Sequence, residues 1–199
     1  MRELTIATSN PHKIEEISAV LGPLGIGCLP LGRSDIPEPE EDGATFEENA
    51  RIKAIAYARA LDRVVLADDS GLEVDALGGA PGVHSARYAG VGATRAERDQ
   101  ANNAKLLAAL EGVPDRMRTA RFVCVLSIAR PDGTILAEAR GTFDGVIGFA
   151  PRGVNGFGYD PLLVLPDGRT SAELSSDEKN ARSHRGNALR ALVRCLAPT

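Results

Sequence analysis

The chain has 199 residues, of which 43% are hydrophobic and 25% charged, a composition that supports a buried core and argues against disorder. Its 23 basic and 27 acidic residues give a formal net charge of −4, so we expect neither a nucleic acid nor a membrane surface as a partner. No run approaches the roughly 18 apolar residues of a membrane span, and no signal-peptide core is present. We therefore expect one cytoplasmic domain, residues 1–199, that is an enzyme or a binding module.

The first third of the chain alternates apolar runs, which predict buried strands, with helical patterns that follow a cap. Asn10 is suited to cap a helix with Pro11 in its first turn, and Thr45 with Glu48 forms a capping box. The expected elements are a strand at 4–7, a helix ending before Gly22, a strand at about 26–31, an acidic loop at 36–43, a helix from 45 to about 61 and a strand at 64–67. This order places Asp68 and Asp69 at the carboxyl end of the third strand.

The rest of the chain carries two further capping boxes, Thr94 with Glu97 and Ser175 with Glu178. The expected elements are a glycine-rich stretch with one helical turn at 78–92, a helix from 94 to 112, an antiparallel hairpin of 121–129 and 134–143, a polar-aromatic loop at 155–161, a strand at 162–165 and one helix from 175 to about 196. Because the strands are joined by both crossovers and a hairpin, we expect a mixed α/β sheet.

The turn after the first strand offers donors for an anion. Backbone N–H groups at a helix start suit phosphate oxygens, and Thr8, Ser9 and Asn10 add side-chain donors. Lys13 adds a positive charge in the first helical turn. A purely structural helix cap is the alternative for this segment.

The adjacent carboxylates Asp68 and Asp69 are a stronger signal. Two neighbouring charges repel and are costly to desolvate unless a cation offsets them. A hard divalent ion such as Mg²⁺, with further oxygens from the acidic cluster 40–42, explains the pair. A solvated acidic turn is the alternative.

Aromatic residues are scarce, which makes Phe157 and Tyr159 candidates for stacking a nucleobase, with core filling as the alternative. On one continuous last helix, Lys179, Ser183 and His184 have the spacing to share a face. The basic residues are 19 arginines and only four lysines, at positions 13, 53, 105 and 179. We hypothesise that some of these positions need a compact ammonium group. The three widely spaced cysteines predict core side chains and no zinc site.

Five segments in series resemble the inosine-triphosphate pyrophosphatase family: 8–13 (TSNPHK), 40–50, 67–90, 156–161 (GFGYDP) and 178–185 (EKNARSHR). The resemblance covers essentially the whole chain. It implies Mg²⁺-dependent cleavage of ITP, dITP or XTP to the monophosphate and pyrophosphate. It also implies an elongated, twisted mixed α/β sheet flanked by helices, with two lobes, a nucleotide cleft between them, and a homodimer.

The resemblance also assigns roles to individual residues. Asp69 matches the acid-base and metal aspartate, with Asp68 and Lys53 as further catalytic candidates. Glu40 matches a metal ligand, and Glu41 is a possible helper. The residues that match substrate contacts are Thr8, Ser9, Asn10, Pro11, His12 and Lys13 for phosphate, Ser70, and, for the base, Phe157, Gly158, Tyr159, Asp160, Lys179, His184 and Arg185.

A mechanism follows as a hypothesis. Lys13, Lys53 and Mg²⁺ would neutralise the roughly four negative charges of a triphosphate, and Asp69 would accept a proton from the attacking water. Two alternatives stay open: a septum-type nucleotide pyrophosphatase acting on other bases, and a non-catalytic nucleotide-binding protein. A nucleic-acid-binding module is the weakest alternative because the net charge is negative.

Overall fold

The computed structural model describes residues 3–8, 11–32 and 36–196. The chain divides into two compact units. The first unit comprises Met1–Asp69, Cys124–Thr142 and Arg182–Thr199, and the second unit comprises Ser70–Val123 and Phe143–Ala181. Each unit contains its own apolar core.

The strands found in the described residues form a mixed six-stranded sheet in the order β2-β1-β3-β4-β5-β6, which confirms the predicted α/β class. β1 pairs in parallel with both β2 and β3, whereas β5 and β6 are antiparallel. The strands are β1 (Glu3–Ile6), β2 (Gly27–Pro30), β3 (Val65–Val74), β4 (Thr119–Ala129), β5 (Ile135–Ile147) and β6 (Leu163–Val164).

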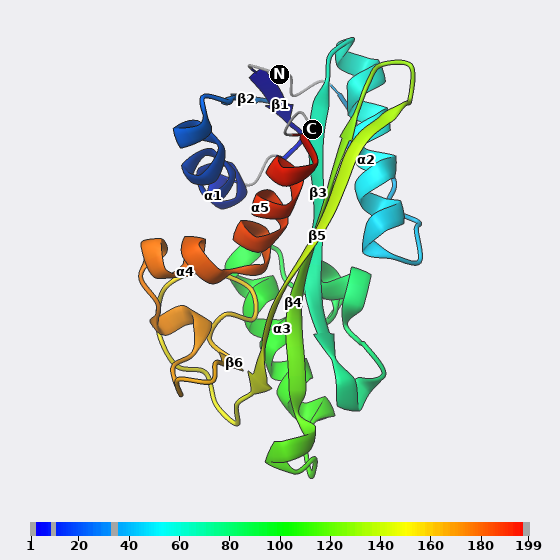
Figure 1. The fold of residues 1–199 in the computed structure, drawn as a ribbon. Coiled ribbons are helices and arrows are strands. Elements are labelled where there is room, and N and C mark those ends of the chain that lie inside the picture. The colour runs from blue at the N-terminus through cyan, green and yellow to red at the C-terminus, as the bar shows by residue number, and fades with distance from the viewer. Residues whose placement is uncertain (1–2, 9–10, 33–35, 197–199) are drawn as a thin grey trace. The chain divides into compact units, whose positions relative to one another are not determined.

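The first unit contains three α-helices of the described chain: α1 (Pro11–Leu21), α2 (Phe46–Leu61) and α5 (His184–Leu196). Figure 1 shows α1 and α5 side by side on one side of the strands and α2 on the other. Ile17 of α1 and Leu189 of α5 share one apolar cluster, whereas Tyr57 of α2 belongs to another. Apolar side chains on both faces of the strands therefore bury this part of the sheet.

The second unit contains α3 (Arg95–Ala109) and α4 (Ser176–Arg182). Its core joins the end of β3, α3 and the loop after β5, with Leu72, Leu106 and Tyr159 among its buried members. Short 3₁₀ helices are found at Gly22–Leu24, Asp75–Leu77, Gly82–Arg87, Asp115–Met117 and Ser171–Glu173. The turn at Gly82–Arg87 confirms the helical turn expected in the glycine-rich stretch.

The three predicted capping boxes are present. At the start of α2 the Thr45 side chain accepts the N–H of Glu48, and at the start of α3 Thr94 accepts the N–H of Glu97 in the same way. Before α4 the Glu178 carboxylate accepts the N–H of Ser175 at 2.9 Å. Local hydrogen bonding therefore determines where these helices begin.

Two predictions about elements were wrong. β3 does not end at residue 67 but continues to Val74, so Asp68 and Asp69 lie inside a buried strand. The last helix is not continuous, because α4 ends at Arg182 and α5 begins at His184. The reason is Ser183, whose Oγ accepts the N–H of Gly186 at 3.2 Å and thereby caps a new helix.

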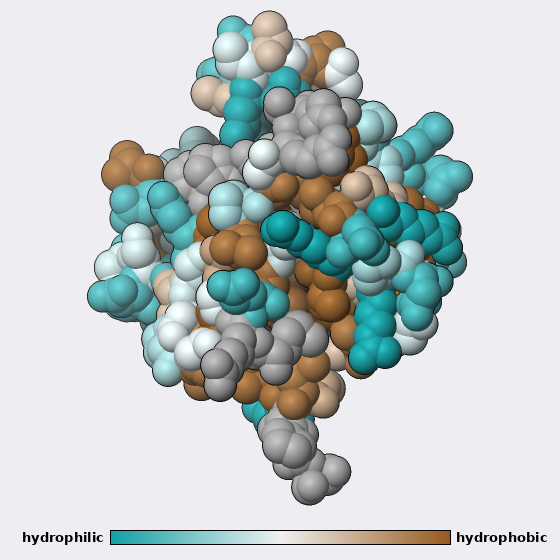
Figure 2. All heavy atoms as spheres, turned by 90° about the horizontal axis from the view of Figure 1, so that it is seen from above, coloured by the Kyte–Doolittle hydropathy of each residue, from teal (hydrophilic) through white to brown (hydrophobic). Residues whose placement is uncertain are grey.

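None of the helices in the described ranges is both long and apolar enough to cross a membrane. On the face drawn in Figure 2, hydrophilic residues stand on either side of a band of hydrophobic ones. The large hydrophobic side chains that the described residues expose are Leu24, Val91, Met117, Phe149 and Val154.

Candidate functional site

Asp68 lies at the centre of a buried charge cluster in the first unit. Its Oδ2 is 2.9 Å from Lys13 Nζ and 3.3 Å from Arg185 Nη2. Arg185 is fully buried and also donates to Glu16. Burial alone would raise the pKa of Asp68, but the charges of Lys13, Arg185 and Lys53 hold it well below its ordinary value. Asp68 therefore stays ionised and ties α1, β3 and α5 together.

Asp69 has a different environment, although it is the next residue. Its Oδ1 accepts a hydrogen bond from Lys53 Nζ at 3.0 Å, and Lys53 also lies 3.1 Å from Glu41. Its Oδ2 is buried and has no hydrogen-bond partner among the residues that the structure describes. Burial raises the pKa of Asp69, and Lys53 opposes this shift in part. The pKa of Lys53 is raised above its ordinary value. Burial lowers this pKa, but the nearby carboxylates of Asp69, Asp68 and Glu41 together raise it by a larger amount.

Alternation along β3 explains how two adjacent carboxylates have different partners. Successive side chains of a strand point to opposite faces of the sheet. On this strand Asp68 meets Lys13 of α1 and Arg185 of α5, whereas Asp69 meets Lys53 of α2. The result is one carboxylate that binds two cations and a second whose Oδ2 has no hydrogen-bond partner among the described residues.

The residues around Asp69 fit a magnesium ion. In the described ranges no group of three or more His, Cys, Asp or Glu side chains forms a complete metal cage. Mg²⁺ does not require one, because it commonly binds one or two carboxylates together with substrate phosphates and water. The buried Oδ2 of Asp69 and the carboxylate of Glu41 are oxygens of this kind. Glu40, the other expected ligand, is exposed.

The predicted phosphate-binding segment is described only in part. Thr8 follows β1, and its N–H donates to the carbonyl of Ile6 at 3.0 Å. Ser9 and Asn10 lie outside the described residues, and of Pro11 and His12 only their place at the start of α1 is described. Lys13, in the first turn of α1, reaches Asp68.

A second group of predicted residues comes together in the second unit. Asp160 Oδ2 accepts hydrogen bonds from Lys179 Nζ at 2.6 Å and from the N–H of Phe157 at 2.8 Å. Its Oδ1 accepts from Ser171 Oγ at 2.7 Å. The Phe157 ring lies 4.5 Å from the guanidinium of Arg95 and 5.0 Å from Lys179 Nζ, measured to the ring centroid. A half-buried aromatic ring therefore stands beside a buried ammonium group.

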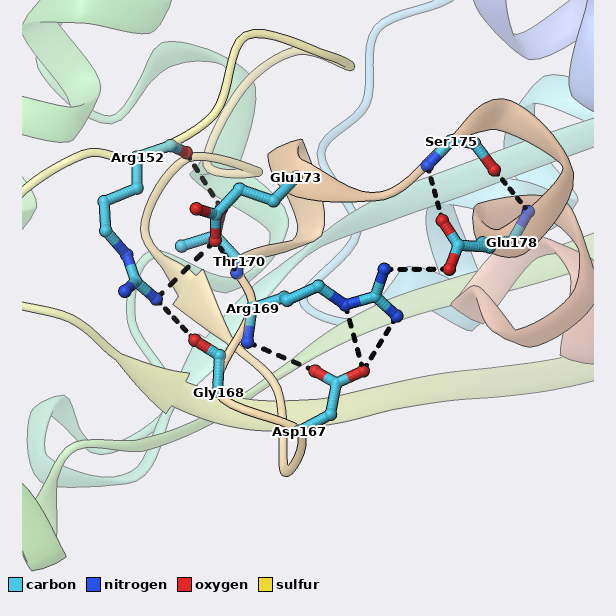
Figure 3. A network of polar contacts seen from close by, with 8 residues as sticks. All are labelled: Arg152, Asp167, Gly168, Arg169, Thr170, Glu173, Ser175 and Glu178. Atoms are coloured by element: carbon cyan, nitrogen blue, oxygen red, sulfur yellow. Dashed lines mark hydrogen bonds and ion pairs between the residues drawn. The ribbon is translucent and has the colours of Figure 1, made fainter.

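Figure 3 shows what holds the start of α4 and hence Lys179. Arg169 donates from Nη1 to Glu178 at 2.8 Å and from Nη2 to Asp167 at 3.0 Å. The capping box of Ser175 with Glu178 lies beside this pair. The hairpin-like turn at 167–170 is thereby joined to the first turn of α4.

The loop around Phe157 is also hydrogen-bonded to α3. The N–H of Gly158 donates to Asp99 at 2.9 Å, and its carbonyl accepts from Asn103 at 3.0 Å. Tyr159 is buried in the core and donates from its hydroxyl to the carbonyl of Ser85 at 2.9 Å. Of the two aromatic side chains of this loop, Tyr159 therefore belongs to the core, whereas Phe157 is only half-buried.

Two further predicted substrate contacts, Ser70 and His184, lie on separate elements, β3 and α5. Ser70 is partly buried in β3, immediately before Gly71, where a Cβ would meet the hydroxyl of Ser85. His184 is buried and opens α5. Because Ser183 separates α4 from α5, the predicted shared helical face of Lys179, Ser183 and His184 was wrong.

Sequence reasoning missed Glu16 and Asn49. Each lies one helical turn from a lysine on the same helix: Glu16 follows Lys13 on α1, and Asn49 precedes Lys53 on α2. This spacing is a signal that points to a shared face. It does not reveal that Glu16 binds Arg185, which is 169 residues away in sequence.

The fold and this site define a mixed α/β protein that gathers buried carboxylates and cations around one available oxygen, a combination suited to a metal-bound polyphosphate. The chain belongs to the Ham1 family, whose family model matches residues 4–195. It is 52% identical over 198 residues to a dITP/XTP pyrophosphatase of an Exiguobacterium species, covering 98% of this chain and 97% of that one. The Geobacillus kaustophilus dITP/XTP pyrophosphatase is 52% identical over 191 residues, covering 95% and 91%.

Among solved structures, the chain is similar to a HAM1 protein from Coxiella burnetii, with a TM-score of 0.87, 44% identity and 98% of each chain covered. These relatives confirm the family resemblance predicted from the sequence.

Proposed function

We propose that this protein hydrolyses the non-standard purine nucleoside triphosphates ITP, dITP and XTP to the monophosphate and pyrophosphate. It is a hydrolase of phosphoric anhydrides, in keeping with its family and with the names of its relatives. The observation that carries the proposal is the buried Asp69, which Lys53 holds by one oxygen while the other has no partner among the described residues. That arrangement suits a base for a water molecule or a ligand for a metal ion.

The cations of the first unit support a polyphosphate as substrate. Lys13 and Lys53 each pair with an aspartate of β3; the Lys13 side chain is partly exposed, whereas Lys53 is buried beside Asp69. Phosphoryl transfer depends mainly on positioning and on stabilising charge, so no covalent nucleophile is required. Lys13 is placed to bind the triphosphate, whereas Lys53 both neutralises charge and orients Asp69.

Magnesium is the cofactor of this proposal, with Asp69 and Glu41 as its protein ligands. When bound, the ion would neutralise phosphate oxygens and help activate water. The residues of the chain then have separate tasks: Asp69 accepts the proton of the attacking water, Lys53 fixes the orientation of Asp69, and Asp68 anchors Lys13.

Base selection is proposed for the second unit. Hypoxanthine and xanthine present an acceptor oxygen at position 6, and Lys179 beside the Phe157 ring supplies a donor. Adenine presents an amino group there, so the buried ammonium group would face another donor. A buried donor without an acceptor costs binding free energy, which should disfavour adenine. The bonds of Arg185 to Asp68 and Glu16 assign that residue to the charge cluster, so Lys179 is our first candidate for base recognition.

We place the protein in the cytoplasm as a homodimer that acts on free nucleotides and binds neither nucleic acid nor membranes. The negative net charge supports the proposal that the protein does not bind nucleic acid, since a polyanion would be repelled overall.

The test is pyrophosphate release from ITP, dITP, XTP, GTP, ATP, dTTP and UTP, with and without Mg²⁺. We expect Mg²⁺-dependent release that is fastest with the first three. Preference for dTTP or UTP would favour the septum-type alternative, and nucleotide binding without pyrophosphate release would favour a non-catalytic role.

A further inference from the structure

Asn49 is fully buried on α2, one turn before Lys53. Its Oδ1 accepts the N–H of Gly43 at 2.9 Å, which fixes the orientation of the amide because a backbone N–H requires an acceptor. The other end, Nδ2, is buried and has no hydrogen-bond partner within the described ranges. An unmade buried hydrogen bond costs about 1–3 kcal/mol, so the unpaired Nδ2 offsets what the bond to Gly43 contributes to stability.

The bond from Asn49 belongs to a set that holds the end of the acidic loop. The N–H groups of Ala44 and Thr45 both donate to Glu48 Oε2, at 2.7 and 3.2 Å. Three successive N–H groups, those of residues 43–45, therefore bind side chains from the first turn of α2. The packing is close, since a Cβ on Gly43 would lie 2.6 Å from Asn49 Oδ1.

Glu41 lies two residues before this tether, and its carboxylate is 3.1 Å from Lys53 Nζ. Lys53 and Asn49 extend from the same face of α2, so one helix holds both the loop backbone and the carboxylate. Freedom of the chain at Gly43 would be transmitted directly to Glu41.

We propose that Asn49 is a positioning residue for the reaction: it fixes the acidic loop so that Glu41 stays beside Lys53 and is available to the Mg²⁺–triphosphate unit. This inference rests on the proposed function. Residues that orient a metal ligand typically change metal affinity or activity by about 10–100-fold when they are replaced.

The principal variant is Asn49→Leu, which keeps the number and branching of the side-chain heavy atoms and removes both polar ends. We expect faster backbone hydrogen exchange over residues 40–45 in the protein without nucleotide or metal. We also expect the Mg²⁺ concentration for half-maximal pyrophosphate release to rise about tenfold, while the melting temperature stays the same or increases. A merely structural asparagine would lower the melting temperature and leave the Mg²⁺ requirement unchanged, and that result would overturn the proposal.

Glu48→Gln is the matched control, because glutamine retains the capping box and the two neighbouring bonds. Its Mg²⁺ requirement should equal that of the unmodified protein. If Asn49→Leu does not fold, Gly43→Ala tests the same tether from the loop side, because its Cβ displaces the backbone from Asn49. Unchanged exchange over 40–45 and an unchanged Mg²⁺ requirement in that variant would equally overturn the proposal. Failure of the unmodified protein to release pyrophosphate would instead refute the proposed function, while hydrogen exchange would still report on the tether.

Discussion

Replacing each of the two adjacent aspartates by asparagine should separate stability from activity. Asp68→Asn removes the carboxylate that Lys13 and Arg185 share. Breaking a buried ion pair by removing one partner costs about 3–5 kcal/mol. We expect the lower end, about 3 kcal/mol, because Arg185 retains Glu16 and the partly exposed Lys13 can regain water. For a protein of this size that free energy lowers the melting temperature by roughly 6–12 °C.

Asp69→Asn should have the opposite profile. Burial raises the pKa of Asp69, so its charge opposes folding at neutral pH, and a neutral side chain there removes that opposition. Lys53 also keeps Glu41 as a partner. We therefore expect a change in unfolding free energy of less than about 1 kcal/mol and a loss of turnover of at least about 100-fold, the usual contribution of a general base.

The assay pairs thermal or urea unfolding with pyrophosphate release for both variants. The pKa of Asp68 is lowered from its ordinary value of 3.8, so the stability that it contributes is present above that pH and is lost as the pH falls below it. The difference in stability between the unmodified protein and Asp68→Asn should accordingly shrink below about pH 4. Equal destabilisation by the two substitutions would refute the division of roles.

Three further predictions concern other parts of the chain. Hydrogen bonds from the backbone at the start of α4 lower the pKa of Glu178 to about 2. In an NMR titration the Glu178 carboxyl group should therefore remain ionised down to about pH 3. A titration midpoint near 4.5 would contradict the capping geometry. Burial raises the pKa of the Cys124 thiol to about 12. A thiol reagent at pH 8 should therefore modify the exposed Cys195 of the native protein and leave Cys124 intact, and peptide mass spectrometry measures both. Gly156→Ala would drive a Cβ into the carboxylate of Asp160, so it should raise the KM for ITP; an unchanged KM would separate Asp160 from base recognition.

Local signals allowed most elements to be predicted from the sequence. Each capping box combines a hydroxyl with a carboxylate three residues later, so the starts of α2, α3 and α4 follow from short-range chemistry. The break at Ser183 was missed because a serine inside a helical pattern is compatible with both a continuous helix and a new cap. The length of β3 was missed for a different reason: charged residues argue against a buried strand until their partners are known.

The contacts within the candidate site were also only partly predictable from the sequence. The pairing of Asp68 with Arg185 spans 117 residues and depends on how β3 and α5 pack, which no local pattern encodes. The resemblance made Glu40 the metal ligand and Glu41 only a possible helper, whereas in the structure it is Glu41 that meets Lys53 and Glu40 is exposed. Neighbouring residues on one helix could have been found by spacing, whereas partners on different elements required the fold.

The most direct test of the central claim is the identity of the products formed from ITP in the presence of Mg²⁺, followed by ³¹P NMR for the unmodified protein and for Asp69→Asn. We predict equal amounts of IMP and pyrophosphate from the unmodified protein and almost none from the variant. Formation of IDP and inorganic phosphate, or normal turnover by the variant, would contradict cleavage of the α–β anhydride at Asp69.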